Sequence, residues 1–178
     1  MAEREKIVVG EVRFSYVHVF EPTSVTEDGA KKYNISIIIP KSNKKAIEKI
    51  KAAVQKTYNE SLGFFNGKLP KVWNNPLRDG DTEKEDEAYA DSMFLTANSK
   101  FKPGVVDANL EPIIDPEEFY SGCYGRVSLN FFPYNVNGNK GIAVGLCNLQ
   151  KLRDGERLGG SGTSAEDDFA NIDDDDLM

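Results

Sequence analysis

The sequence predicts a mainly β protein: a small antiparallel barrel with at least one peripheral helix and a disordered acidic tail. Segments rich in β-branched and aromatic residues, which favour strands, recur between stretches that hold Gly, Pro, Asn or Asp. One lysine-rich segment has helical periodicity instead. Residues 159–178 contain seven acids and no base, a composition that does not support a packed core. The expected strands are 7–20, 31–39, 92–98, 104–107, 122–134 and 142–150.

The first half of the chain is expected to form a hairpin followed by the helix. Thr26-Glu-Asp-Gly29 is typical of a turn and separates the first two strands. The helix is expected at about 43–60, where Ile47, Ile50, Val54 and Tyr58 recur at steps of three and four. The long segment that follows, 61–91, has no periodicity and is expected to be a loop, which in a compact domain is often functional.

The second half adds the remaining strands and ends in the tail. The strands at 122–134 and 142–150 are expected to form a hairpin around a turn at 135–141. This order of elements suits an OB-like barrel, the best-known intracellular example of a small antiparallel barrel with an outer helix. We therefore expect a barrel domain over 1–152 and a flexible acidic tail over 153–178.

Composition excludes several classes of protein. No apolar run approaches the ~18 residues that a membrane helix needs, and the charged start is unlike a signal peptide, so a cytoplasmic protein is expected. One histidine and two cysteines, Cys123 and Cys147, exclude a Cys/His zinc site. The net charge of −7 is uneven, because residues 1–78 hold 14 bases against 8 acids. A basic surface for a polyanion is therefore compatible with an acidic chain.

The strand at 122–134 has two different faces under period-two alternation. Cys123, Gly125, Val127, Leu129 and Phe131 suit a core. The opposite face combines rings with a guanidinium and hydrogen-bonding groups, which suits stacked bases and phosphates. The alternative is that these rings pack beneath the long loop. This second face carries Tyr124, Arg126, Ser128, Asn130, Phe132 and Tyr134.

Other segments offer rings or cations of the same kind. Asn98-Ser-Lys-Phe-Lys102 places Phe101 between two lysines, and Trp73 lies in the long loop between Lys71 and Arg78. Trp73 could pack the loop down or cover a bound strand. The rings expected to stack on bases are Tyr124, Phe132, Tyr134, Phe94, Tyr16 and Trp73. The cations expected to contact phosphates are Arg126, Lys100, Lys102, Arg78, Lys31 and Lys32.

The acids of 79–91 support two alternatives. They could hold Mg²⁺ for a metal-dependent nuclease, or they could belong to an acidic adaptor or DNA mimic. A solvated acidic loop is the simpler interpretation, because two-metal sites draw their ligands from separated strand ends. The sequence indicates no cofactor: it has no P-loop, and the glycine-rich 160–165 follows no strand, unlike a dinucleotide site.

The C-terminus ends an acidic run with two apolar residues. Such a tail could enter an apolar pocket rimmed by Lys or Arg on a partner protein. Because it is tethered, it could also compete with a polyanion for the protein's own basic surface. The residues expected to do so are Asp173, Asp174, Asp175, Asp176, Leu177 and Met178.

Several short segments, taken in order, resemble a known family. They are Phe14-Ser-Tyr16, Phe20-Glu-Pro22, Tyr33-Asn-Ile-Ser-Ile37, Pro76-Leu-Arg-Asp-Gly80, Asn98-Ser-Lys100, Lys102-Pro-Gly104 and Tyr120-Ser-Gly-Cys-Tyr-Gly-Arg126. Over about residues 6–160 the chain resembles the single-stranded-DNA-binding proteins of tailed bacteriophages, a group long filed as a domain of unknown function. The resemblance implies an OB fold, sequence-independent binding of single-stranded DNA without catalysis, and a tail that recruits replication or recombination proteins in the host cytoplasm.

Overall fold

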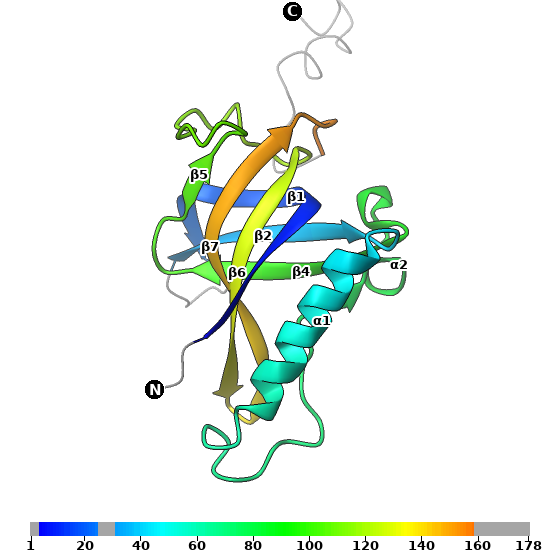
Figure 1. Ribbon diagram of the computed structural model, residues 1–178, viewed down its shortest axis with the longest axis vertical. Coiled ribbons are helices and arrows are strands. Elements are labelled where there is room, and N and C mark those ends of the chain that lie inside the picture. The colour runs from blue at the N-terminus through cyan, green and yellow to red at the C-terminus, as the bar shows by residue number, and fades with distance from the viewer. Residues whose placement is uncertain (1–3, 25–30, 159–178) are drawn as a thin grey trace, which may run out of the picture.

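The computed structural model describes residues 4–24 and 31–158, and its centre is a closed barrel of five strands (Figure 1). The barrel strands are β1 (Glu5–Ser24), β2 (Lys31–Pro40), β4 (Ser92–Ser99), β6 (Tyr124–Val136) and β7 (Asn139–Arg153). The pairs β1–β2, β1–β6, β2–β4 and β6–β7 are antiparallel, and a parallel contact between β4 and β7 closes the circle. This is the five-stranded OB arrangement, so the predicted fold class is confirmed.

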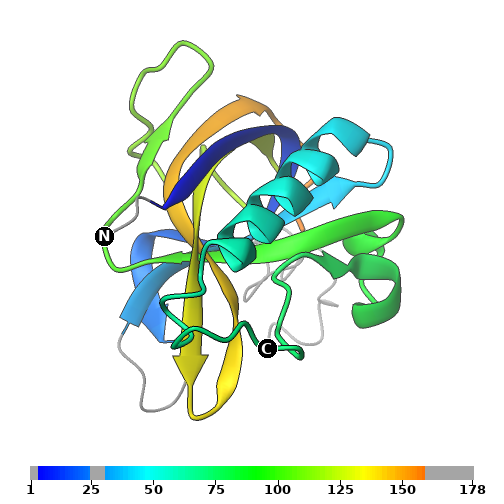
Figure 2. The ribbon, with the colours of Figure 1, turned by 60° about the horizontal axis from the view of Figure 1, so that its bottom comes forward.

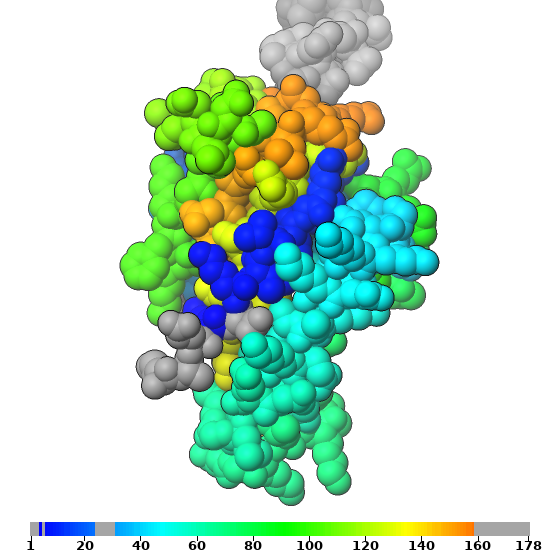
Figure 3. Space-filling model, viewed as in Figure 1, coloured from blue at the N-terminus to red at the C-terminus, as the bar shows by residue number. Residues whose placement is uncertain are grey.

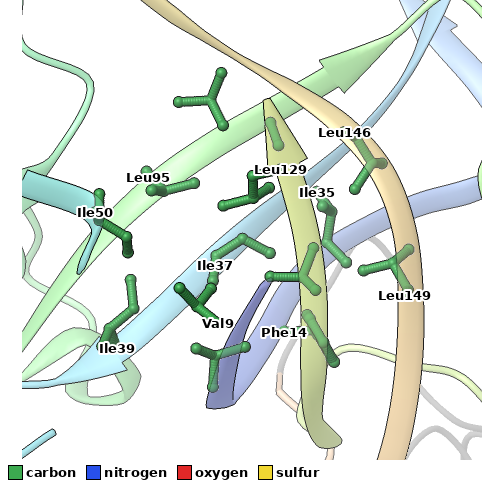
Figure 4. Packing of buried hydrophobic residues seen from close by; sticks show 14 of the residues in the cluster. Val9, Phe14, Ile35, Ile37, Ile39, Ile50, Leu95, Leu129, Leu146 and Leu149 are labelled. Carbon is green, nitrogen blue, oxygen red and sulfur yellow. The ribbon is translucent and has the colours of Figure 1, made fainter. Parts of the chain in front are cut away.

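The barrel interior is filled by alternate side chains from every strand. On β6, Val127, Leu129 and Phe131 are buried, and Cys123 and Gly125 lie at or before its start with the same orientation, as the alternation predicts. Figure 4 shows Ile35, Ile37 and Leu95 meeting Leu129, Leu146 and Leu149 across the interior. One face of β6 is thereby fixed inward, and the other is available at the surface.

Helix α1 (Lys44–Asn59) covers one end of the barrel (Figure 2). Asn43 caps it, because its side-chain oxygen accepts a hydrogen bond from the amide of Ala46 at 3.3 Å. Ile47, Ile50 and Val54 are buried on the side that faces the strands. Figure 3 shows α1 beside β1, where the Lys49 ammonium donates to the Val8 carbonyl at 2.7 Å.

The segment expected to be a long loop contains short elements. They are β3 (Arg78–Asp79), α2 (Gly80–Glu83) and a 3₁₀ turn at Glu87–Tyr89. β3 pairs with β4, and Tyr89 is fully buried against Phe94. Beyond β4, β5 (Gly104–Val106) pairs in parallel with β7.

The β6–β7 hairpin is longer than expected. Its strands pair up to Val136 and Asn139, so the turn is Asn137-Gly138 instead of the whole of 135–141. Both turn residues have positive φ, 53° and 86°, which is the geometry that an Asn-Gly hairpin turn favours. In Figure 1 this hairpin extends past the barrel beside the segment that follows α1.

The chain remains against the barrel after β7. Arg13 donates to the carbonyl of Glu156 at 2.7 Å, and the amide of Leu158 donates to the carbonyl of Ser121 at 2.9 Å. Residues 154–158, which the sequence assigns to the tail, therefore contact the barrel. The expected partner-binding residues 173–178 lie outside the described residues. Among the residues described, no helix has the length and apolar character needed to span a bilayer.

Candidate nucleic-acid interface

A groove follows β7 between β4 and β6. We call its larger part, with a volume of about 700 Å³, the wide part, and its smaller part, with about 550 Å³, the narrow part. The two parts share Asn98 and follow β7 from Ile142 to Cys147, so we treat them as one β7 groove. The wide part is lined by Arg4, Lys32, Asn98, Ser99, Lys100, Phe101, Lys102, Asn130, Phe132, Gly145, Leu146 and Cys147. The narrow part is lined by Trp73, Asn74, Asn75, Pro76, Leu77, Arg78, Glu83, Thr96, Asn98, Tyr134, Ile142, Ala143 and Val144.

The groove exists because β4 and β7 diverge. Their ladder has a single pair, Asn98 with Gly145. On one side of this pair β5 takes over the edge of β7, and on the other side Asn74 pairs with Gly141. Between β4 and β7, the floor of the groove carries the small residues Ala143 and Gly145. Side chains from β7 therefore do not fill the groove.

The wide part of the groove is basic. Arg4, Lys32, Lys100 and Lys102 line it, and no acid is among the described residues of its lining. Converging cations without a nearby carboxylate attract phosphates and are only partly screened at physiological salt. The narrow part differs, because Arg78 there pairs with Glu83 through its Nε at 2.8 Å and through a second nitrogen.

Aromatic rings lie along the same groove. The guanidinium of Arg4 lies 4.1 Å from the centre of the Phe132 ring, and Tyr134 continues the row into the narrow part. Phe101 is 81% exposed at the tip of the loop after β4, between Lys100 and Lys102. Rings next to cations suit a ligand that combines flat bases with phosphates.

Trp73 both anchors the loop and contributes to the groove. Its ring stacks on Tyr58 of α1 with centres 4.6 Å apart and planes 17° apart. The Tyr58 hydroxyl donates to the carbonyl of Pro70 at 2.7 Å, which fixes the same loop to the helix. Trp73 also lines the narrow part of the groove.

Of the twelve expected ring and cation positions, seven line the groove and five do not. Those outside it are Tyr124, Arg126, Tyr16, Lys31 and Phe94. Tyr124 lies at the other end of β6, between the guanidinium groups of Arg13 at 5.2 Å and Arg153 at 3.8 Å. Arg126 packs beside Gly10 of β1. The seven that line the groove are Phe132, Tyr134, Trp73, Lys100, Lys102, Arg78 and Lys32.

Phe94 and Tyr16 lie outside the groove for different reasons. Phe94 is 4% exposed and packs with Ile38 and Tyr89 in a small cluster, so its ring is not available to a ligand here. Tyr16 lies where the pairing of β1 with β2 shifts, with a φ of 47°. Its ring is half exposed, so its expected role in stacking stays a prediction.

Four residues outside the twelve expected positions also contribute to the groove: Phe101, Asn98, Asn130 and Arg4. The lysines on either side of Phe101 were the sequence signal for that ring. Asn98 and Asn130 stand on the polar faces of their strands, but only the closure of the barrel brings them together at Gly145. Nothing in the sequence around Arg4 indicates that it meets Phe132.

Several acids of 79–91 have structural partners. The Lys41 ammonium lies 3.0 Å from Asp79 and 2.7 Å from Asp81, and this hydrogen bond from Lys41 lowers the pKa of the Asp81 carboxyl. Asp81 also accepts from the amide of Asp91 at 2.8 Å. Within residues 4–24 and 31–158 no three His, Cys, Asp or Glu side chains are grouped to hold a metal ion. In the described part of the chain, no cluster of three such groups supports the nuclease alternative.

Known proteins of similar sequence and structure are phage proteins. A family model described as "Enterobacter phage Enc34, ssDNA-binding protein" matches residues 5–178. "Putative protein p50" of Acyrthosiphon pisum secondary endosymbiont phage 1 is 37% identical over 176 residues, 94% of each chain. The single-stranded DNA-binding protein from bacteriophage Enc34, solved in complex with ssDNA, has a TM-score of 0.76 at 25% identity, over 86% of this chain and 89% of that one. The single-stranded DNA-binding protein gp2.5 of bacteriophage T7 shares the fold, with a TM-score of 0.60 at 14% identity over 97% of each chain.

Proposed function

Because this chain belongs to the Enc34 phage ssDNA-binding protein family, we propose that it binds single-stranded DNA along the β7 groove. The observation that supports this location is the wide part of the groove, where Arg4, Lys32, Lys100 and Lys102 line the same pocket as Phe132 and none of the described lining residues is acidic. The family model, which matches nearly the whole chain, and the similar solved structures are described as single-stranded-DNA-binding proteins. We therefore assign the chain no catalytic role.

In this proposal phosphates and bases occupy different parts of the groove. Lys100, Lys102 and Lys32 contact phosphates from the rim, whereas bases turn toward Phe132 and Tyr134. Arg4 covers Phe132 now, so it moves aside with the phosphate when a base stacks on that ring. Stacking is worth about 1–3 kcal/mol per base and tolerates every base, so binding is largely independent of sequence.

We extend the proposal to the C-terminal tail. Leu158, the last described residue, packs against the cluster of Ile38, Tyr89 and Phe94. Thr96, two residues after Phe94 on β4, lines the narrow part of the groove. The acidic tail thus starts near one end of the groove, which supports competition between the tail and DNA. In the host cytoplasm, the same tail, with Asp173–Asp176, Leu177 and Met178 at its end, would recruit replication or recombination proteins.

A chain ending at Gly159 tests the competition. It should bind oligo-dT more tightly than the full chain at low salt, and the difference should shrink as salt screens the tail. Equal affinities of the two chains at low salt would exclude competition, although the recruiting role would remain to be tested with partner proteins.

The main experiment compares single-stranded DNA, double-stranded DNA and single-stranded RNA in one electrophoretic shift series. Single-stranded DNA should be retarded at the lowest protein concentration, and binding should quench Trp73, the only tryptophan of the sequence. No retardation of single-stranded DNA at low salt would refute the proposed function.

A pair of double variants tests the location. Replacing Lys100 and Lys102 by Ala should weaken binding. It should also make the slope of log K against log salt concentration shallower by about 1.4, because each phosphate contact on a single strand contributes about 0.7 to that slope. The matched control replaces Lys44 and Lys45, which are exposed on α1 outside the groove. If both double variants weaken binding equally, the groove is not the binding surface.

A further inference from the structure

Two amide oxygens in the β7 groove lack hydrogen-bond partners. Among the described residues, the side-chain oxygens of Asn98 and Asn130 are the buried side-chain polar atoms without a partner. A buried acceptor that is left unpaired destabilises a protein, because it has lost its hydrogen bonds to water without replacement. Both residues line the wide part of the groove, so the two unpaired acceptors coincide with the proposed DNA site.

The strand register brings the two amides to one point. Asn98 of β4 and Asn130 of β6 are both paired with Gly145, which lies between them on β7. A Cβ atom at position 145 would lie 2.1 Å from the Asn130 oxygen, so the Asn130 side chain extends across the glycine toward β4. Only glycine at this position leaves space for that side chain.

The orientation of the Asn130 amide is set by its neighbour. Its Nδ2 donates to the Sγ of Cys147 at 3.4 Å, which leaves Oδ1 as the group available to a ligand. The torsion that turns an Asn amide about its Cβ–Cγ bond is soft. A modest turn of either side chain therefore brings its Oδ1 toward the open groove.

We propose that Asn98 and Asn130 form a subsite for the exocyclic amino group of a nucleobase. The inference rests on the proposed function, because it requires single-stranded DNA in the β7 groove. An exocyclic amino group carries two N–H bonds, one for each unpaired oxygen. Phe132 and the surrounding cations hold the base and its phosphate, and the amide pair contacts the edge of the base.

The subsite predicts a base preference on top of general binding. Cytosine, adenine and guanine carry an exocyclic amino group, whereas thymine presents carbonyl oxygens and one ring N–H. Thymine in the subsite leaves an amide oxygen unpaired or places a carbonyl against it. Amino-bearing bases should therefore bind more tightly than thymine, although every base can stack.

The test compares two oligomers that differ only in the polar edge of the base. Oligomers of about 16 nucleotides, the upper end of OB-fold site sizes, are made of thymidine or of 5-methyl-deoxycytidine, which have the same methyl group and the same outline. Fluorescence anisotropy with the full chain at mildly alkaline pH measures both affinities. The 5-methyl-deoxycytidine oligomer should bind about tenfold more tightly, the effect of one good two-point base contact.

Variants then assign the preference to the amide pair. Asn130→Ala and Asn98→Ala should each reduce the ratio of the two affinities to about one. Asn135→Ala is the matched control, because Asn135 is exposed on the same strand outside the groove lining. It should retain the tenfold ratio.

The outcomes separate this inference from the proposed function. If the wild-type chain binds both oligomers equally, the amino subsite is wrong and the groove still binds DNA. A preference that survives both asparagine variants also refutes the subsite. If neither oligomer binds at low salt, the proposed function fails and the subsite fails with it. The comparison on the wild-type chain can refute the subsite even if a variant does not fold.

Discussion

The ion pair between Arg78 and Glu83 limits the positive charge of the narrow part of the groove. Both residues line that part, and the Arg78 Nε donates to a Glu83 oxygen at 2.8 Å. Arg78 is more than half exposed, so a phosphate could reach its guanidinium. In the wild-type chain that phosphate has to compete with Glu83. We therefore predict that Glu83→Gln increases the affinity for single-stranded DNA.

The magnitude follows from the release of one more counterion. On a single strand each phosphate contact changes the slope of log K against log salt by about 0.7. One added contact then increases the binding constant by about eightfold at about 50 mM salt and by about threefold at about 200 mM. The gain should disappear as salt approaches about 1 M.

The assay is a fluorescence titration with oligo-dT at a series of salt concentrations. Glu85→Gln is the matched control, because it removes the same charge from the same acidic stretch but does not line the groove. It should raise affinity much less and leave the slope almost unchanged. Equal effects of the two variants would mean that general repulsion, and not the pairing of Arg78, determines the change.

Two further residues of the groove give sharp tests. Phe101→Ala should weaken binding of oligo-dT by about five- to 150-fold, the value of one stacked base, whereas Phe64→Ala, an exposed ring after α1, should leave affinity unchanged. Iodoacetamide should modify Cys147, which is partly exposed in the groove, and saturating oligo-dT should slow that reaction. Cys123 should not react in the folded chain, because burial excludes the reagent and raises the pKa of its thiol. An unchanged rate at Cys147 with bound DNA would place DNA outside the groove.

The fold was predictable where one strand face is buried. The alternation over 122–134 assigned Val127 and Leu129 to the core because a strand with one face inward has a strict period of two, and β6 keeps that period. The same rule fails on β1, where shifts in the pairing interrupt the period and turn Tyr16 outward. Local patterns contain no information about where such a shift occurs.

The site was harder to predict, because a strand face is not a site. Tyr124 and Phe132 share one face of β6 but are eight residues apart, about 26 Å along an extended strand. Tyr124 is therefore held between Arg13 and Arg153 far from the groove. Phe94 shares the face of Thr96, but Tyr89 of the preceding 3₁₀ turn and Ile38 of β2 cover it. These outcomes depend on side-chain packing that the alternation within one strand does not specify.

Gly145 lies where the barrel closes and also lines the groove, so its replacement tests whether DNA binds at this point. A Cβ at this position would meet the side chain of Asn130 and push it into the groove, away from the Cys147 sulfur to which it donates. Gly145→Ala should therefore keep the barrel folded but weaken oligo-dT binding, and adding Asn130→Ala should restore much of the affinity. Gly125→Ala is the contrasting case, because its Cβ would lie 1.8 Å from the Gln150 backbone carbonyl, and it should lower the melting temperature markedly. If Gly145→Ala binds oligo-dT like the wild type, the bound DNA does not occupy the space above Gly145.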